Sequence, residues 1–389
     1  MQAMKQRWTF RCYPTPEQEQ ILAQTFGCTR YVYNWALSER TKAFQRGERM
    51  NYAQSSAALT ALKRQPETIW LNDVSSIPTQ QALRHLQTAF ANFFAKRAAY
   101  PSFKRKDGRQ SAEFTRSGFG FDVGTRRLTI AKVGNLKVKW SRRVTCDPST
   151  VTVIRNPSGR YFVSLTVDVD VAPLAETGQS VGIDFGVARL ATLSTGERIA
   201  NPKHMQSRAG RLALLQKRLA KKQNGSKRRA LARRAVARQH EKIGNCRKDA
   251  LEKLSTRLVK EFDVICIEDL NLRGMVKNHS LARSLSDASI GTAIRMLEEK
   301  AERYGKRTVR VDRWFPSSKM CSDCGHINSA VVLGVQQWIC PKCNSHHDRD
   351  DNAAHNILAA GLAVSAHGDG IRALSASAAK PAVCEVRTT

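Results

Sequence analysis

Four cysteines in the last quarter of the chain restrict its folding more than any other sequence feature. They form two Cys-x-x-Cys pairs, Cys321/Cys324 and Cys340/Cys343, which are separated by 15 residues. This spacing is typical of two turns that each supply two thiolates to one tetrahedral zinc ion. We therefore predict one structural Zn²⁺ at these four cysteines, in preference to four free thiols. Four protein ligands leave this zinc no open position for catalysis.

The other cysteines and the nearby histidines show no comparable pattern. Cys266 lies in the apolar run 264–267 and is expected to behave as a small buried apolar residue. His346 and His347 follow the second cysteine pair, and we interpret them as surface or helix-adjacent histidines and not as zinc ligands. A cysteine nucleophile has no support in the sequence.

The charge of the chain indicates a polyanionic partner. Its 389 residues include 64 Lys and Arg against 33 Asp and Glu, a formal net charge of +31. Residues 203–260 hold 19 of these cations and only three acids, with apolar stripes that predict a long helical region turning near 224–226. Charges of one sign repel each other unless phosphates neutralise them, so we interpret this region as facing nucleic acid. A scattered basic surface, or a structural protein of the ribosomal type, is the alternative.

Individual candidates for nucleic-acid contact come from two basic stretches. The loop that follows Tyr100 interleaves aromatic and cationic side chains, and the turn within 203–260 concentrates lysine and arginine. The candidates are Phe103, Lys104, Arg105, Lys221, Lys222, Arg228 and Arg229.

Apolar runs in the chain are short. None approaches the roughly 18 residues that a membrane span needs, and no apolar signal core follows the first residues. We therefore expect a cytoplasmic protein without a membrane partner, whose cysteines are reduced or bound to metal.

Periodicity divides the chain into helical, β and mixed parts. Residues 17–64 and 78–97 have the period of amphipathic helices. Short alternating runs between 128 and 167 predict a small antiparallel barrel or sheet, which the N-terminal strand 6–12 is expected to join. The mixed part is predicted to contain strands 181–185, 189–194, 263–268 and 308–312 and a helix 288–304.

An acid inside an apolar strand is the first candidate catalytic residue. In the strand 181–185, Val181, Ile183 and Phe185 share one face, whereas Asp184 points to the other. A carboxylate in such surroundings is unfavourable unless its charge is compensated. Either a bound cation or a buried salt bridge would compensate it.

Two further acids stand at the ends of elements. Glu268 ends the apolar run 264–267, at the kind of strand end where ligands gather in covered sheets. The third is one of Asp348, Asp350 and Asp351, any of which could instead cap a helix N-terminus. Helical spacing favours Asp350, because apolar residues follow it at three, four and seven positions.

Together, Asp184, Glu268 and Asp350 predict a catalytic metal site. Carboxylates, waters and phosphate oxygens are the ligands that Mg²⁺ prefers. Two Mg²⁺ ions held by such a trio can cut a phosphodiester, with one ion activating the attacking water and the other stabilising the leaving 3′ oxygen. In a chain this basic, the predicted reaction is nucleic-acid hydrolysis.

The motifs around these residues identify a family resemblance. They are Gly182-Ile183-Asp184-Phe185-Gly186, Ile267-Glu268-Asp269-Leu270-Asn271, Phe315-Pro316-Ser317-Ser318-Lys319 with the cysteine pairs, and Asp348-Arg349-Asp350-x-Asn352-Ala353-Ala354. In these motifs the chain resembles the TnpB family, transposon-encoded RNA-guided DNA nucleases that are similar to the type V CRISPR effectors. The resemblance spans nearly the whole chain, and its later motifs are highly specific.

The resemblance implies a multidomain fold of α/β and β-barrel parts. It implies a RuvC-like nuclease domain of the RNase H fold, with Asp184, Glu268 and Asp350 as its metal-binding triad. It also implies that a helix of a recognition insertion reads a short motif beside the target. Gln80 and Gln81 of this helix are candidates for contact with base edges, and solvated glutamines on the helix surface are the alternative. A wedge-like barrel is expected to take its first strand from 1–12 and the rest from 101–175, with the helical insertion at 13–100. The nuclease domain is expected at 176–364, with an inserted zinc ribbon at 316–347 that binds target nucleic acid. Residues 365–389 are expected to form a disordered tail rich in Ala, Gly and Ser.

The function implied by the resemblance is RNA-guided DNA cleavage. A guide RNA transcribed from the transposon end would pair with one strand of the target double-stranded DNA, and the protein would read only a short adjacent motif. One protein per guide is expected, although the sequence does not fix the stoichiometry.

Two other functions are alternatives to guided cleavage. A guide-dependent DNA-binding protein or repressor, or an RNA chaperone, would explain the charge and the zinc ribbon equally well, but the intact acid trio argues against it. A strand-transfer transposase uses related folds, but the chain lacks the His-x-His motif of the single-strand type.

Overall fold

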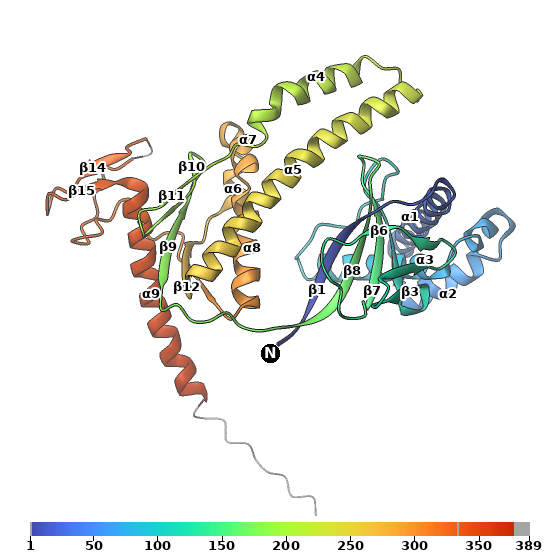
Figure 1. Ribbon diagram of the computed structural model, residues 1–389, viewed down its shortest axis with the longest axis horizontal. Coiled ribbons are helices and arrows are strands. Elements are labelled where there is room, and N and C mark those ends of the chain that lie inside the picture. The colour runs from blue at the N-terminus through green and yellow to red at the C-terminus, as the bar shows by residue number, and fades with distance from the viewer. Residues whose placement is uncertain (1, 333, 377–389) are drawn as a thin grey trace, which may run out of the picture. The chain divides into compact units, whose positions relative to one another are not determined.

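The computed structural model describes residues 2–332 and 334–376, which divide into two compact units (Figure 1). The first unit comprises 2–170 and 215–239. The second comprises 171–214 and, within the described residues, 240–376. Across the described residues, no helix combines the length and the apolar character needed to cross a bilayer.

The β part of the first unit is built from eight strands. They are β1 (Gln2–Cys12), β2 (Gln110–Thr115), β3 (Phe119–Asp122), β4 (Arg127–Ile130), β5 (Gly134–Leu136), β6 (Val138–Lys139), β7 (Thr150–Arg155) and β8 (Tyr161–Val171), with a 3₁₀ turn η2 (Arg116–Gly118). One sheet has the order β2-β7-β8-β1-β6 and a second has the order β3-β4-β5. The two sheets share one core, which contains Phe10, Phe114 and Leu165. The N-terminal strand therefore joins this sheet as predicted, and barrel closure stays a prediction.

Three helices of this unit lie between β1 and β2 in the chain. They are α1 (Pro16–Gln45), α2 (Tyr52–Leu62) and α3 (Ser76–Phe94), with a 3₁₀ helix η1 (Pro66–Asn72) between the last two. The predicted continuous helix over 17–64 is wrong, because the chain breaks after Gln45. Gly47 adopts a positive φ of 80° there, and Asn51 starts α2 with a capping box of its own. The helices pack through a core that contains Leu37, Leu59 and Leu83.

A mixed five-stranded sheet is the centre of the second unit. Its strands are β9 (Ser180–Phe185), β10 (Arg189–Leu193), β11 (Arg198–Ala200), β12 (Val264–Glu268) and β13 (Arg307–Val311). Four of them lie within one residue of the predicted strands, and β11 was not predicted. The strand order is β11-β10-β9-β12-β13. Strand β10 is antiparallel to β9, whereas β12 runs parallel to both β9 and β13. Strands β9 and β12 therefore both end at the same edge of the sheet.

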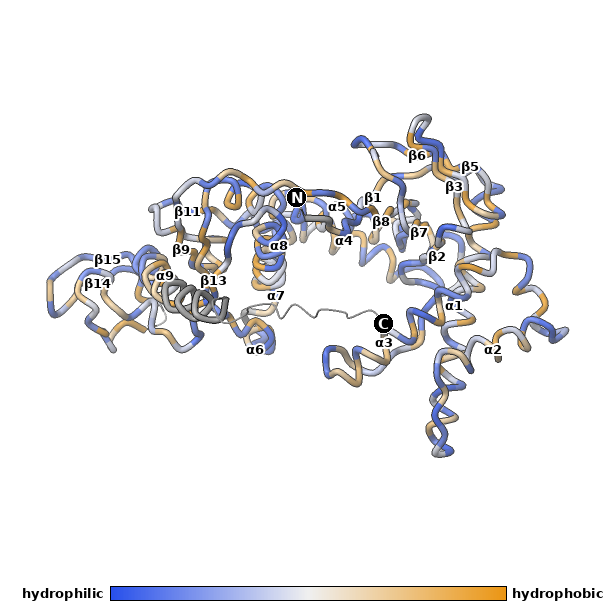
Figure 2. The backbone as a smooth tube through the Cα atoms, turned by 90° about the horizontal axis from the view of Figure 1, so that it is seen from below, coloured by the Kyte–Doolittle hydropathy of each residue, from blue (hydrophilic) through white to orange (hydrophobic). Residues whose placement is uncertain are grey.

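Helices cover both faces of this sheet (Figure 1). Val181, Ile183 and Phe185 pack against α5 (Lys227–Glu261) and α8 (Ile290–Arg303), as their alternation predicted. The opposite face contacts α9 (Arg349–Ala376). Gly182 permits this contact, because a Cβ there would lie 2.1 Å from the carbonyl oxygen of Ala354. Figure 2 shows orange, hydrophobic segments in β9, β13 and α8, as expected for a covered sheet.

Helix α9 extends further than the sequence predicted. The structure describes 365–376 as a continuation of the helix, whereas a disordered tail was expected from 365. Alanine is the strongest helix former, so a segment rich in alanine can propagate a helix that packing has already nucleated. The remainder of the predicted tail, 377–389, lies outside the described residues.

A basic helical hairpin links the two units along the chain. It consists of α4 (Ala209–Ala220) and α5, and it turns at 224–226, as predicted, with Gly225 at a φ of 80°. A 3₁₀ turn, η3 (Gln206–Arg208), precedes it, and α6 (Leu272–Met275) and α7 (His279–Ala288) follow β12.

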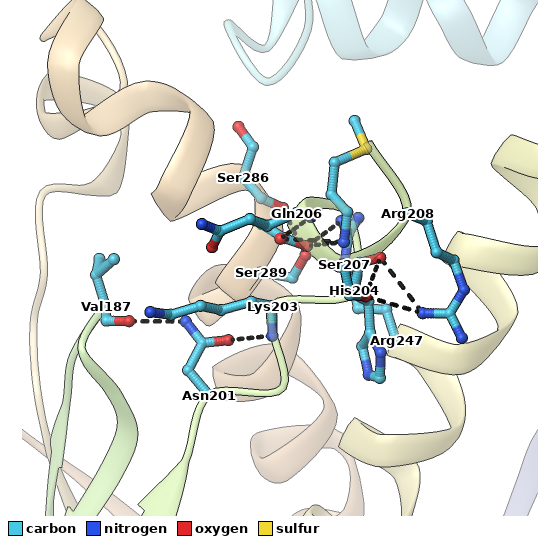
Figure 3. Close-up of polar contacts among 12 residues, drawn as sticks. Val187, Asn201, Lys203, His204, Gln206, Ser207, Arg208, Arg247, Ser286 and Ser289 are labelled. Carbon is cyan, nitrogen blue, oxygen red and sulfur yellow. Dashed lines mark hydrogen bonds and ion pairs between the residues drawn. The ribbon is translucent and has the colours of Figure 1, made fainter. Parts of the chain in front are cut away.

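The start of the hairpin is fixed by polar contacts (Figure 3). The buried carboxylate of Asp287 on α7 accepts hydrogen bonds from the amides of Met205 (2.8 Å) and Gln206 (3.1 Å). It also pairs with Arg247 of α5 at 3.0 Å. Asn201 ties the preceding loop to the sheet through the carbonyl oxygen of Val187 (2.7 Å). These bonds hold the loop before α4 to the sheet and helices of the second unit.

Candidate active site and zinc centre

The four cysteines of the predicted zinc site converge on one point. All four sulfur atoms lie within 4.8 Å of one another, with Cys321–Cys343 and Cys324–Cys340 separations of 3.6 Å. A tetrahedral zinc with 2.3 Å bonds places its sulfurs about 3.8 Å apart. Hydrogen bonds from Ser345 lower the pKa of Cys343 to about 6, towards the thiolate that zinc requires. Burial raises the pKa of Cys321 to about 12, so this thiol needs a bound cation to ionise. The predicted convergence is confirmed, and the cluster fits Zn²⁺.

One of the two neighbouring histidines differs from the sequence interpretation. Strands β14 (Gln337–Ile339) and β15 (His346–Asp348) pair, with Trp338 opposite His347. His346 is exposed as expected, but His347 is buried, packs on Trp338 and places Nε2 3.1 Å from the Cys321 sulfur. The surface interpretation is therefore wrong for His347, because the strand alternates and turns this residue inward.

The charges of the other two candidate acids act on the first, Asp184. The parallel register pairs Ile183 with Ile267, which brings Asp184 and Glu268 to neighbouring strand ends. Burial, followed by the negative charges of Glu268 and Asp350, raises the pKa of Asp184 to about 7. The structure thus brings Asp184 within electrostatic reach of both Glu268 and Asp350.

The acid trio is nevertheless more open than a closed ligand cage. Two groups of three or more side chains among the described residues have ligand atoms within 4.8 Å of one another, and both include Cys321 of the cysteine cluster. Neither group contains Asp184, Glu268 or Asp350. Like-charged carboxylates repel each other at short range, so an open arrangement is expected when no cation is present to draw them together. The donor set of three carboxylates fits Mg²⁺ in its chemistry.

The three crowded aspartates at the start of α9 have separate roles. Asp348 caps the helix, because its Oδ1 accepts from the amide nitrogens of Asp350 (3.1 Å) and Asp351 (3.4 Å). Asp351 forms an ion pair with Arg198 of β11, with one Nε–Oδ1 distance of 3.1 Å. Asp350 is the one whose charge raises the pKa of Asp184. Asp350 also has two longer ion pairs, at 3.7 Å to Arg189 and 3.6 Å to Arg349. These contacts favour Asp350 over its two neighbours, and its assignment as the third catalytic acid stays a prediction.

Glu268 is held by a residue that the sequence reasoning did not assign. The hydroxyl of Ser317, which is buried, donates a hydrogen bond to Oε1 of Glu268. Ser317 precedes the first zinc cysteine by four residues, so it connects the ribbon to the second candidate catalytic acid.

Two buried asparagines on α9 hold the same segment. The side-chain amide of Asn356 donates to the carbonyl oxygens of Ser317 (2.8 Å) and Met320 (2.6 Å). Asn352 donates to Met320 (2.7 Å) and accepts from the amide of Ser322 (2.9 Å). Their spacing of four residues on an otherwise apolar helix face was the available signal. The helix that begins beside Asp350 is therefore bonded to the segment that holds Glu268.

Several predicted nucleic-acid contacts have partners inside the protein. Gln80 accepts a hydrogen bond from Ser56 at 3.2 Å. The ammonium of Lys104 lies over the ring of Tyr33, 4.0 Å from its centroid, and burial lowers its pKa. Arg229 donates to the carbonyl oxygen of Lys222 (2.8 Å) near the end of α4. These contacts give Gln80, Lys104 and Arg229 structural roles whatever else they bind.

Other candidates remain accessible. Phe103 is 60% exposed, and Gln81 is partly exposed. The cations Arg105, Lys221, Lys222 and Arg228 are exposed as well. Their contacts with nucleic acid stay a prediction.

Three family models match successive parts of the chain. OrfB_IS605, described as a probable transposase, matches residues 162–279, and the Cas12f1-like TNB domain matches 291–357. A helix-turn-helix domain matches 1–49, where the structure has one strand and the single long helix α1. The first two matches cover all three candidate acids and the cysteine cluster.

Curated relatives cover almost the whole chain. A protein of Streptomyces pristinaespiralis named "Putative RNA-guided DNA endonuclease" is 52% identical over 96% of this chain and 93% of its own length. The Escherichia coli K12 protein named "Putative RNA-guided DNA endonuclease InsQ" is 32% identical over 94% of this chain and 95% of its own length. A protein of Acanthamoeba polyphaga mimivirus named "TnpB-like protein L79" is 26% identical over 90% of this chain and 72% of its own length. The chain belongs to the TnpB family.

A solved structure supports the same fold. The structure titled "Cryo-EM structure of the Cas12f1-sgRNA-target DNA complex" matches with a TM-score of 0.56, covering 91% of this chain and 98% of that chain. The sequences are 15% identical, so this likeness concerns the fold alone.

Proposed function

We propose that this chain is an RNA-guided DNA endonuclease of a transposable element, which cuts target DNA beside a short motif. Its partners would be a guide RNA from the transposon end and the target double-stranded DNA. The names of its closely similar relatives and the net charge of +31 support this function.

The observation that carries the proposal is the environment of Asp184. Its carboxyl group is partly buried beside two further acids, which raises its pKa to about 7. Such an accumulation of negative charge weakens the fold unless a cation neutralises it, so it is more easily explained as a metal site than as a structural feature. The mixed sheet that carries Asp184 and Glu268, with order β11-β10-β9-β12-β13, supports an RNase H-like nuclease domain of the RuvC type.

Each residue has a defined part in the proposed chemistry. Asp184, Glu268 and Asp350 would hold two Mg²⁺ ions, which supply Lewis-acid stabilisation of the charge that develops on the scissile phosphate. Ser317 orients the carboxylate of Glu268 through its hydroxyl. Asp348 fixes the first turn of α9 and so the position of Asp350. The cysteine cluster would hold one Zn²⁺ and keep the ribbon folded.

Guided cleavage of a plasmid tests the proposal. The protein is purified together with the RNA that it retains, the RNA is sequenced, and a plasmid that carries a matching target is incubated with the complex and Mg²⁺. We expect cutting at the matched target, dependence on Mg²⁺, and loss of cutting in Asp184→Ala and Glu268→Ala while RNA binding remains.

Neighbouring acids provide matched controls. Asp351 and Asp269 are hydrogen-bonded to Arg198 and Arg313, so neither is expected to hold the catalytic metal. In the part of the chain that the structure describes, Asp350 has only longer ion pairs with arginine, at 3.7 Å to Arg189 and 3.6 Å to Arg349, and it remains more available to a cation. Asp351→Ala and Asp269→Ala should therefore still cut. An unmodified protein that binds its guide and target but never cuts would favour the alternative, a guided DNA-binding protein or repressor. Equal activity in Asp184→Ala and in the unmodified protein would exclude the trio as the active site.

A further inference from the structure

The first unit contains a basic pocket that none of the roles above explains. Its volume is about 230 Å³. Four segments that are distant in sequence enclose it: α1, the loop before β2, the turn between β7 and β8, and the first turns of α5. All of its lining residues belong to the first unit. The charged residues that line it are Arg30, Lys106, Asp107, Arg155, Arg233 and Arg234.

Gln110 gives the pocket a defined shape. Its side-chain amide donates to the carbonyl oxygens of Arg105 (3.0 Å), Lys106 (3.1 Å) and Gly108 (3.2 Å). Its oxygen accepts from Arg30 at 2.8 Å, and the β2–β7 register places Gln110 opposite Arg155. One glutamine thus orders the loop that presents Lys106 and ties it to α1. The pocket is therefore built by specific bonds and is not a gap between mobile loops.

The charge of the pocket is not neutralised by the protein. Five cations line it against one acid, Asp107, which pairs with Arg233 at 2.9 Å. In the described part of the chain, no carboxylate pairs with Lys106, Arg155 or Arg234. Cations drawn together from four segments repel each other, so their convergence is unfavourable without an anion between them.

We infer that this pocket binds one nucleotide of the guide RNA, with its phosphate on the cations Lys106, Arg155 and Arg234. The inference rests on the proposed function. A volume of about 230 Å³ falls below the roughly 300–1,000 Å³ of typical small-molecule sites, which suits one unit of a polymer better than a free metabolite. Recognition of single-stranded RNA uses loops and bulges whose nucleotides turn out of the helix, whereas duplex DNA presents a smooth backbone. A concave site therefore favours RNA over DNA.

The experiment combines salt-dependent affinity with chemical probing of the RNA. Lys106→Ala/Arg234→Ala removes two exposed cations from the pocket and should leave the fold intact. Affinity decreases with added salt, and the steepness of this decrease, on logarithmic axes, should be reduced by about 0.7 for each phosphate that the protein no longer neutralises. In the complex, one short segment of the guide RNA should become reactive in the double variant while the rest keeps its protection.

A matched variant separates a specific site from general charge. Arg49→Ala/Arg64→Ala removes the same charge from exposed positions of the same unit outside the pocket. It should leave the reactivity of that RNA segment unchanged. Equal loss of affinity in both double variants with no local change in the RNA would overturn the inference, as would a change confined to the target DNA. If the unmodified protein binds no RNA at all, the proposed function fails; if it binds RNA and only the local effect is missing, the pocket assignment alone fails.

Discussion

The side-chain amide of Asn356 lies 2.8 Å from the carbonyl oxygen of Ser317 and donates a hydrogen bond to it. This bond links α9, which starts beside one candidate catalytic acid, to the segment whose hydroxyl holds another, Glu268. The same segment leads directly into the cysteine cluster. The ribbon and the acids therefore form one connected structure, so a change in either should affect the other.

Ser317 is predicted to position Glu268 for metal binding. Ser317→Ala removes the hydroxyl that bonds Oε1 but leaves the backbone carbonyl bonded to Asn356. Loss of a partner that orients a metal ligand typically costs about 10–100-fold in metal affinity or activity. We expect the Mg²⁺ concentration for half-maximal cutting to rise, with guide RNA affinity unchanged. Ser318→Ala, at the adjacent serine, is the control, and equal Mg²⁺ dependence in the two variants would contradict the role.

The cysteine cluster is predicted to contain one zinc ion on which cleavage depends. Cys340→Ser should lose about one zinc per chain by elemental analysis, because three thiolates cannot complete the tetrahedron. Cutting should fall with it, since the ribbon begins at the segment that holds Glu268. Cys146 lies outside the cluster, so Cys146→Ser should keep its zinc. Full zinc content in Cys340→Ser would refute the assignment.

Asp184 is predicted to destabilise the protein when no divalent cation is bound. Its pKa is about 7 in the folded chain against an ordinary 3.8, so the folded state holds this proton more tightly than the unfolded state does. Stability should therefore be unaffected below about pH 4 and should fall as the pH rises to about 7. Asp184→Asn removes this penalty and should raise the melting temperature at pH 8, with little effect at pH 4.

Thermal unfolding of both proteins at the two pH values, without added divalent ions or chelator, measures this difference. Acid weakens zinc binding by the cysteines equally in both proteins, so this effect cancels when they are compared at the same pH. Added Mg²⁺ should raise the melting temperature of the unmodified protein at pH 8 and have less effect on Asp184→Asn. A lower melting temperature for Asp184→Asn than for the unmodified protein at pH 8 would show that the carboxylate stabilises the fold.

Gly182 is predicted to be essential for the packing of α9 on the sheet. Gly182→Ala would place Cβ 2.1 Å from the carbonyl oxygen of Ala354 and 2.6 Å from the amide nitrogen of Leu358. Both are backbone atoms of the helix, so relief requires a shift of α9, and overpacking of this kind typically costs about 1–3 kcal/mol or more. Denaturant unfolding measures the loss. At Gly210 of α4 a Cβ meets nothing within 4 Å, so Gly210→Ala should be neutral or stabilising.

Features that depend on local sequence could be predicted well. The strands 180–185 and 264–268 were found nearly to the residue, because their apolar runs and alternation are local signals. The convergence of the cysteines followed from spacing alone. The turn of the hairpin near Gly225 could be predicted for the same reason.

Features that depend on contacts between distant parts of the chain could not be predicted from the sequence. The burial of His347 depends on pairing with the strand that contains Trp338. The break after Gln45 is different, because Gly47 and the capping residue Asn51 are local signals that mark it in the sequence. The role of Asn356 requires knowledge of which backbone carbonyls lie beside α9. The cations Lys104 and Arg229 resemble their neighbours in sequence but contact Tyr33 and Lys222 in the fold.

The most direct test of the account is to locate a divalent ion. Anomalous diffraction from crystals soaked in Mn²⁺, a substitute for Mg²⁺, should show a peak bounded by the carboxylates of Asp184, Glu268 and Asp350, and the peak should be absent in Asp184→Asn. Full Mn²⁺ occupancy elsewhere on the chain, with none between these three residues, would contradict the proposed active site.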